Sequence, residues 1–188
     1  MYSSPIETEF RGVMFRSRVE ARWAVFLHEL KVDYSYEPPG EFLPSGKLYT
    51  PDFWINDWNA YIEIKADDKD DQGLLRCIEL KNSFSENKFH GVKTKVLMFY
   101  GEPSNLEGFV FLSMFQASEF ETLQVCRFKI EQCKNCGILW GNRGKFGKFR
   151  LSDLEMCDSE SNSKCYESAE ATAKLVTAAL KASTERFK

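Results

Sequence analysis

The spacing of apolar residues in the first third of the chain changes from a helical to a strand period, which limits the possible folds. Over residues 15–30 apolar side chains recur at three- and four-residue steps, which predicts an amphipathic helix. Ser17 near its start, with Glu20 three residues later, is suited to cap it. Two strands are expected next, over residues 48–55 and 60–66, joined by a turn rich in Asn and Asp. Such an order places a helix layer against a sheet.

The remaining chain continues the alternation of helices and strands. A second helix is predicted over residues 72–84, and buried strands over residues 96–100 and 109–114. An alanine-rich stretch, residues 168–187, is helical by propensity. The expected fold class is therefore α/β, a mixed central sheet with flanking helices. With 43% hydrophobic residues in a chain of 188, a core can be buried without disulfides or other cross-links.

Polar residues interrupt the apolar pattern of the two central strands. Strand side chains alternate, so Glu63 and Lys65 are expected on one face and Ile62 and Ile64 in the core. The tight turn brings Asp52 of the preceding strand near Glu63. Charged groups in such a position are costly unless they are paired or bind a metal. Two carboxylates from adjacent strands form a hard-oxygen site suited to Mg²⁺ or Mn²⁺.

Such a site supports phosphodiester hydrolysis, because a metal ion polarises the phosphate and activates a bound water. Lys65 is predicted to orient that water or to neutralise charge in the transition state. Glu20, at the margin of the helical stripe, is predicted to reach the same metal directly or through water. Two interpretations without a catalytic role stay open: a surface ion pair for the strand residues, and a solvent-exposed helix acid for Glu20.

These residues carry a resemblance to a known family. Pro51-Asp52, ten intervening residues and then Glu63-Ile64-Lys65 resemble the PD-(D/E)XK nuclease superfamily. Residues 15–23, Phe-Arg-Ser-Arg-Val-Glu-Ala-Arg-Trp, are similar to the first helix of one of its bacterial and phage branches. Residues 36–38, 49–54 and 181–187 also have counterparts in that branch.

The resemblance implies a restriction-endonuclease-like fold and a role for each matching residue. It implies that Asp52 and Glu63 are metal ligands, that Lys65 is the catalytic lysine, and that Glu20 is the acid supplied by the first helix. Ala66 departs mildly from the pattern, since the branch usually has glycine after the lysine.

Cysteines cluster beyond residue 124, where the composition of the chain changes. Cys133 and Cys136 have the spacing of half a zinc site, and Cys157 with Cys165 is the candidate second pair. We therefore predict a nuclease core over residues 1–125, and a zinc-ribbon-like module with a terminal helix over residues 126–188. The alternatives are buried free thiols or a redox pair. Cys126 could replace Cys165 as a ligand.

The most basic stretch of the chain lies between the two cysteine pairs, with aromatic residues interleaved. Basic side chains neutralise phosphates and phenylalanine can stack on bases, so the stretch predicts nucleic-acid contact. The alternative is a solvated hairpin tip. The residues concerned are Arg143, Lys145, Phe146, Lys148, Phe149 and Arg150.

The net charge and the terminal residues bear on the partners and the cellular location expected for the protein. A net charge of −3 does not favour nucleic acid, although binding depends on local patches rather than on the total. No signal peptide or membrane span is expected, which suggests the cytoplasm of a bacterial or phage-infected cell. The predicted function is a Mg²⁺-dependent DNA endonuclease, with which a homodimer is compatible. The alternatives are an RNA or branched-DNA nuclease, and a non-catalytic subunit of a transposition, repair or defence complex.

Overall fold

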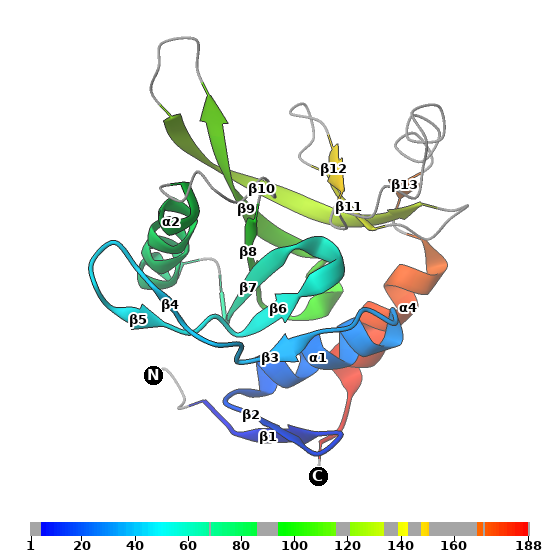
Figure 1. Ribbon diagram of the computed structural model, residues 1–188. Coiled ribbons are helices and arrows are strands. Elements are labelled where there is room, and N and C mark those ends of the chain that lie inside the picture. Colours follow the sequence, from blue (N-terminus) through cyan, green and yellow to red (C-terminus); the bar gives the residue numbers. More distant parts are fainter. Residues whose placement is uncertain are drawn as a thin grey trace.

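The chain forms an α/β fold around a mixed sheet, seen in a computed structural model (Figure 1). Three α-helices, a nine-stranded sheet and two small two-stranded sheets make up the described part. No helix of that part is long and apolar enough to cross a membrane. The structure describes residues 5–67, 69–85, 94–115, 121–133, 139–142, 148–150, 169–170 and 172–187.

The predicted central hairpin is confirmed. Strands β6 (Phe53–Ile55) and β7 (Ala60–Lys65) pair antiparallel, with Phe53 opposite Ile62. Their connection is a 3₁₀ turn, η1 (Asn56–Trp58), followed by Asn59 in the left-handed region at φ 43°. Asparagine tolerates that conformation better than most residues, which explains the sharp reversal.

Past the hairpin, the chain crosses over to a parallel strand. Helix α2 (Asp71–Ser85) leads to β8 (Lys95–Tyr100), which lies parallel to β7. The 3₁₀ turn η2 (Pro103–Asn105) then leads to β9 (Glu107–Phe115), antiparallel to β8. The helix and both strands agree with the sequence prediction, each starting one or two residues earlier.

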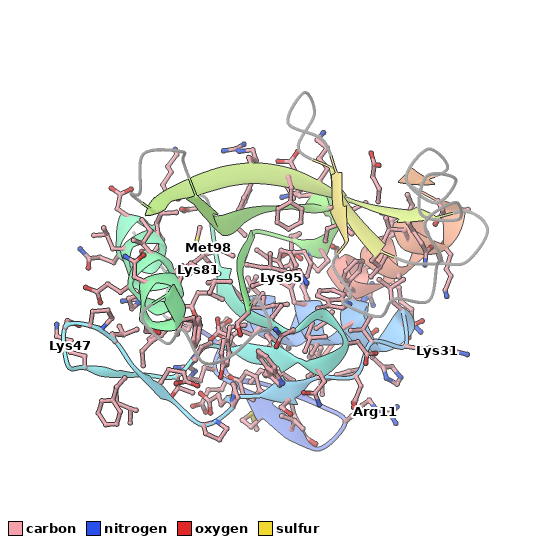
Figure 2. The ribbon with its side chains drawn as sticks, turned by 45° about the horizontal axis from the view of Figure 1, so that its top comes forward. Arg11, Lys31, Lys47, Lys81, Lys95 and Met98 are labelled. Atoms are coloured by element: carbon pink, nitrogen blue, oxygen red, sulfur yellow. The ribbon has the colours of Figure 1, made fainter. Side chains whose placement is uncertain are left out.

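The two faces of the sheet are covered by different helices (Figure 1). Helices α1 (Arg18–Glu29) and α4 (Ala173–Thr184) pack together on one face, where Trp23 stacks on Phe99 of β8 with ring centroids 4.4 Å apart. Helix α2 packs on the other face, where Lys81 and Met98 are labelled in Figure 2. Lys81 is buried there, and its ammonium donates to the carbonyl oxygen of Thr94.

The prediction of one strand over residues 48–55 is wrong. Strand β5 (Leu48–Tyr49) pairs with β4 (Glu41–Phe42) in a separate hairpin, and β6 pairs with β3 (Ser35–Tyr36) in the main sheet. The break falls at Pro51, which lacks the N–H group that a continuous ladder needs. Figure 2 shows Lys47 at the outer end of the β4–β5 hairpin.

Both terminal helices are shorter than predicted, because their capping residues set where they begin. Ser17 is extended (φ −142°, ψ 155°) and caps α1, whereas Phe15 ends β2 (Val13–Phe15), the partner of β1 (Thr8–Phe10). Thr172 caps α4 through the N–H of Leu175, and the residues before it include the short strand β13 (Ala169–Glu170).

The sheet continues well past the predicted boundary at residues 125 and 126. Strand β10 (Glu121–Cys133) crosses that boundary and pairs with β9 over nine positions. Strands β11 (Leu139–Asn142) and β12 (Lys148–Arg150) then extend the same sheet. Strand β10 was not expected from the sequence. A hairpin was considered for the basic stretch, but not as a continuation of the central sheet. Arg143, Lys145 and Phe146 lie outside the described residues, while Lys148, Phe149 and Arg150 form β12.

Candidate active site beside strand β7

A cleft of about 590 Å³ lies beside the end of β7. Glu20, Asp52, Glu63 and Lys65 all line it, so the structure brings together the four residues predicted to carry the chemistry. Its remaining lining residues are Pro5, Arg16, Ser17, Leu48, Tyr49, Thr50 and Arg76.

Asp52 is held at the junction of the central hairpin and helix α1. Its side chain is 3% exposed, and one oxygen, Oδ2, accepts a hydrogen bond of 2.6 Å from the N–H of Ile64. The other oxygen, Oδ1, accepts from Arg16 Nη2 at 2.7 Å. The side chain thus occupies the place next in register to Glu63, since Phe53 is paired with Ile62.

The surroundings of Asp52 disfavour its negative charge. Burial and the neighbouring carboxylates of Glu63 and Glu20 raise its pKa to about 8. The N–H of Ile64 and the ammonium of Lys65 act in the opposite direction and do not outweigh them. The three carboxylates repel one another in a cleft that is partly shielded from water. A cation bound among them would relieve this repulsion.

Glu63 and Lys65 leave β7 on the same face and form an ion pair. Burial lowers the pKa of Lys65, but the charge of Glu63 more than compensates, so that the pKa lies above its usual value. Glu63 is 5% exposed. Within the described part of the chain, its Oε2 atom has no hydrogen-bond partner. The alternative of a surface ion pair on an exposed strand therefore does not hold.

Glu20 is fixed at the N-terminal cap of helix α1. Ser17 Oγ accepts from the backbone N–H of Glu20 at 3.2 Å and donates to its Oε1 at 2.7 Å. Tyr36 donates its hydroxyl to Oε2 at 2.6 Å. Burial and this hydrogen bond raise the pKa of Tyr36, which keeps it protonated as a donor. With Glu20 only 7% exposed, the interpretation as a solvated acid is wrong.

Further residues of the cleft were missed by the sequence analysis. Arg16 donates a hydrogen bond to Asp52, and Tyr36 donates one to Glu20. Tyr49 is mostly buried, and both burial and the negative charge of Glu63 raise its pKa. Arg76 of α2 adds a third cation to the lining. Arg16, Tyr36 and Tyr49 fall within the segments 15–23, 36–38 and 49–54 compared above, but periodicity assigned them no role, because their contacts depend on distant parts of the chain.

The donor set fits a hydrated divalent ion and does not fit a metal cage. No group of three or more His, Cys, Asp or Glu side chains able to hold a metal occurs among the described residues. Mg²⁺, however, usually binds through one or two carboxylates and keeps several waters. Asp52 and Glu63 are such a pair, and the unpartnered Oε2 of Glu63 is a free acceptor for it.

Only part of the cysteine prediction falls within the described structure. Cys133 is the last residue of β10 and Cys126 lies within the same strand. Cys136, Cys157 and Cys165 lie outside the described residues, so zinc binding stays a prediction. Cys77 is a free, fully buried thiol on α2.

No known family model matches the chain, and no curated protein sequence is significantly similar to it.

Proposed function

We propose that this protein is a divalent-metal-dependent endonuclease that hydrolyses phosphodiester bonds of DNA, with a restriction-endonuclease-like fold. The observation that carries the proposal is the adjacency of two buried carboxylates, Asp52 and Glu63, with Lys65 beside them in one open cleft. Buried carboxylates crowded into one cleft are typical of functional sites, since a stable core gains nothing from them.

Each side chain has a distinct role in the proposal. Asp52 and Glu63 hold Mg²⁺ or Mn²⁺, and Glu20 adds a water-mediated contact. The bound ion supplies Lewis-acid polarisation of the phosphate and a more acidic water. Lys65, already paired with Glu63, holds its ammonium where it stabilises charge that develops on the phosphate oxygens. Tyr36 and Ser17 keep Glu20 oriented.

The topology around the cleft supports the fold assignment. A helix supplies Glu20, an antiparallel hairpin supplies the other three residues, and a crossover helix leads to a parallel strand. This order agrees with what the resemblance to PD-(D/E)XK nucleases implies. A structural zinc ion bound by Cys133, Cys136, Cys157 and Cys165 is proposed for the C-terminal region, together with DNA contact by the basic stretch at 143–150.

A non-catalytic nucleic-acid-binding subunit is the rival function. It is favoured by the internal pairing of both acids, Asp52 with Arg16 and Glu63 with Lys65, which leaves each carboxylate with a protein cation. RNA and branched DNA are the alternative substrates.

The decisive experiment incubates the full-length protein with supercoiled plasmid in Mg²⁺, in Mn²⁺ and in EDTA. Linear, single-stranded and branched DNA and RNA complete the substrate panel. We expect metal-dependent cleavage. Asp52→Asn and Glu63→Gln should lower it at least about a hundredfold, because a metal contributes several kcal/mol to the transition state and about 1.4 kcal/mol is a tenfold change.

Asp57→Asn is the matched control, since Asp57 is exposed in the turn between the same two strands. It should cut like the wild type. If the wild type binds DNA but cuts no substrate of the panel, the non-catalytic function is correct. If Asp52→Asn cuts as well as the control while folded, the site assignment is wrong.

A further inference from the structure

Arg16 occupies the entrance of the cleft between two acidic groups. It lies between strand β2 and the N-cap of α1, and its side chain is 56% exposed. The guanidinium donates from Nε to Glu37 at 2.8 Å and from Nη2 to Asp52 Oδ1 at 2.7 Å. Its backbone N–H donates to the Tyr36 hydroxyl, which in turn donates to Glu20. The arginine therefore contacts the network of the proposed metal site without being enclosed by it.

The contact with Asp52 conflicts with metal binding. The N–H of Ile64 donates to Asp52 Oδ2 and Arg16 donates to Oδ1, so a divalent ion bound to this carboxylate would lie close to the guanidinium. A guanidinium and a divalent ion on one carboxylate would repel each other strongly in a partly buried cleft. Arg16 must therefore leave Asp52 when a metal binds. The link to Glu37, which is 42% exposed, keeps the released guanidinium at the cleft.

We propose that Arg16 exchanges between two anions: it pairs with Asp52 when no divalent metal is bound, and with a phosphate of the nucleic acid once a metal occupies Asp52. The inference rests on the proposed nuclease function. It adds a positioning role for Arg16 and a means by which metal binding promotes substrate binding. A planar guanidinium matches the oxygens of a phosphate in two parallel hydrogen bonds. Arg16 is therefore free to bind substrate only when the metal needed for cleavage is bound at Asp52.

Removal of the guanidinium should change two affinities in opposite directions. In calorimetric titrations of metal-free, full-length protein, Arg16→Ala should bind Mn²⁺ about tenfold more tightly, because no charged hydrogen bond has to be broken first. Fluorescence anisotropy with a short labelled DNA duplex in Ca²⁺ should show binding weakened about tenfold, because the charged hydrogen bonds from Arg16 to a phosphate are lost. Arg16→Lys keeps the charge without the fork, and should lie between wild type and alanine in both measurements.

Arg18→Ala is the matched control, because Arg18 is exposed two residues away on the first turn of α1. It should keep the Mn²⁺ affinity of the wild type. Arg18→Ala also measures how far the loss of one basic charge near the cleft strengthens Mn²⁺ binding by itself, so only tightening beyond that of the control is specific to the exchange. Should Arg16→Ala fail to fold, Arg16→Gln replaces it with the same expectation.

The outcomes separate this inference from the proposed function. A wild type that binds Mn²⁺ and cuts DNA, with an Arg16→Ala variant of unchanged or weaker Mn²⁺ affinity, overturns the exchange and leaves the nuclease assignment standing. Unchanged duplex affinity in that variant overturns the phosphate contact. A wild type that binds no divalent ion overturns both proposals at once.

Discussion

Burial and two neighbouring carboxylates disfavour the negative charge of Asp52, and this couples stability to pH. Its pKa of about 8 in the folded chain compares with an ordinary value of 3.8, so between these values the folded protein holds a proton that the unfolded chain releases. Stability contributed by this group is therefore present below pH 4 and is lost as the pH rises toward 8. The side chain of Asp52→Asn does not ionise, so this variant should not lose that stability as the pH rises.

The measurement is thermal unfolding of both proteins in chelator at a series of pH values. The Tm of the variant should exceed that of the wild type by an amount that grows from pH 4 to pH 8 and then stays constant. Asp57→Asn serves as the exposed control and should follow the wild type. A Tm difference that is independent of pH would contradict the assignment of the raised pKa to Asp52.

Lys65 is expected to act on the chemical step and not on metal affinity. Lys65→Ala removes the ammonium paired with Glu63, which leaves that carboxylate available for the ion. The kcat should fall about a hundredfold or more, as for loss of one preorganised donor at a reacting centre. Mn²⁺ affinity should be kept or increased. Lys69→Ala, an exposed lysine of the following turn, is the control. Lost Mn²⁺ affinity in Lys65→Ala would show that the lysine organises the metal site instead.

Residue-level prediction succeeded where the chemistry follows from local periodicity. Strand alternation placed Glu63 and Lys65 on one face, and a tight turn placed Asp52 opposite them. Arg16 and Tyr36 were missed because they reach the cleft from 36 and 16 residues away from their partners in the sequence. Nothing in the local pattern distinguishes Arg16 from the other arginines of its segment.

At the scale of elements, the β4–β5 hairpin forms one rim of the cleft through Leu48 and Tyr49. Leu43, at its bend, is 5% exposed and packs in the cluster under helix α2, whereas Phe42 is 71% exposed. Leu43→Ala should therefore lower the free energy of unfolding by about 2 to 4 kcal/mol. Phe42→Ala should change it by less than about 0.5 kcal/mol, as for most surface substitutions.

Urea unfolding of the two variants checks this difference, and each serves as the control of the other. Equal destabilisation would mean that the exposed face of the hairpin also packs against the protein. Loss of cleavage activity in Leu43→Ala beyond its loss of stability would indicate that the hairpin holds the rim of the cleft in place.

Element prediction failed where non-local pairing decides the outcome. Residues 48–55 alternate like one strand, but Pro51 and the separate partners of its two halves divide them between two sheets. Strand β10 was hidden by the change in composition after residue 124, and it forms because β9 offers a long edge for pairing. Helix α2 and strand β8 were predicted well, since their apolar patterns are regular and local.

At the scale of the whole molecule, the proposed zinc ion would join the C-terminal region to the sheet that carries the proposed active site. Cys133 ends β10, whose other end is paired with β9 of the central sheet. Four thiolates saturate a tetrahedral ion and leave no position for water, so this zinc is expected to support folding and not catalysis. When the zinc is lost, the region around β11 and α4 should unfold before the strands around β7.

Elemental analysis of the purified protein should find about one zinc per chain, the number that a single tetrathiolate site holds. Cys133→Ser and Cys136→Ser should lose the zinc and gain protease sensitivity in the C-terminal region while keeping the Mn²⁺ affinity of the cleft. Cys77→Ala is the control, because that thiol is buried on α2 away from β10 and its loss should leave the zinc in place. Protein that lacks zinc yet has full thermal stability would contradict the structural role. Cys126, the alternative to Cys165 as a ligand, cannot join Cys133 at one ion, because the seven residues of extended strand between them span roughly 23 Å.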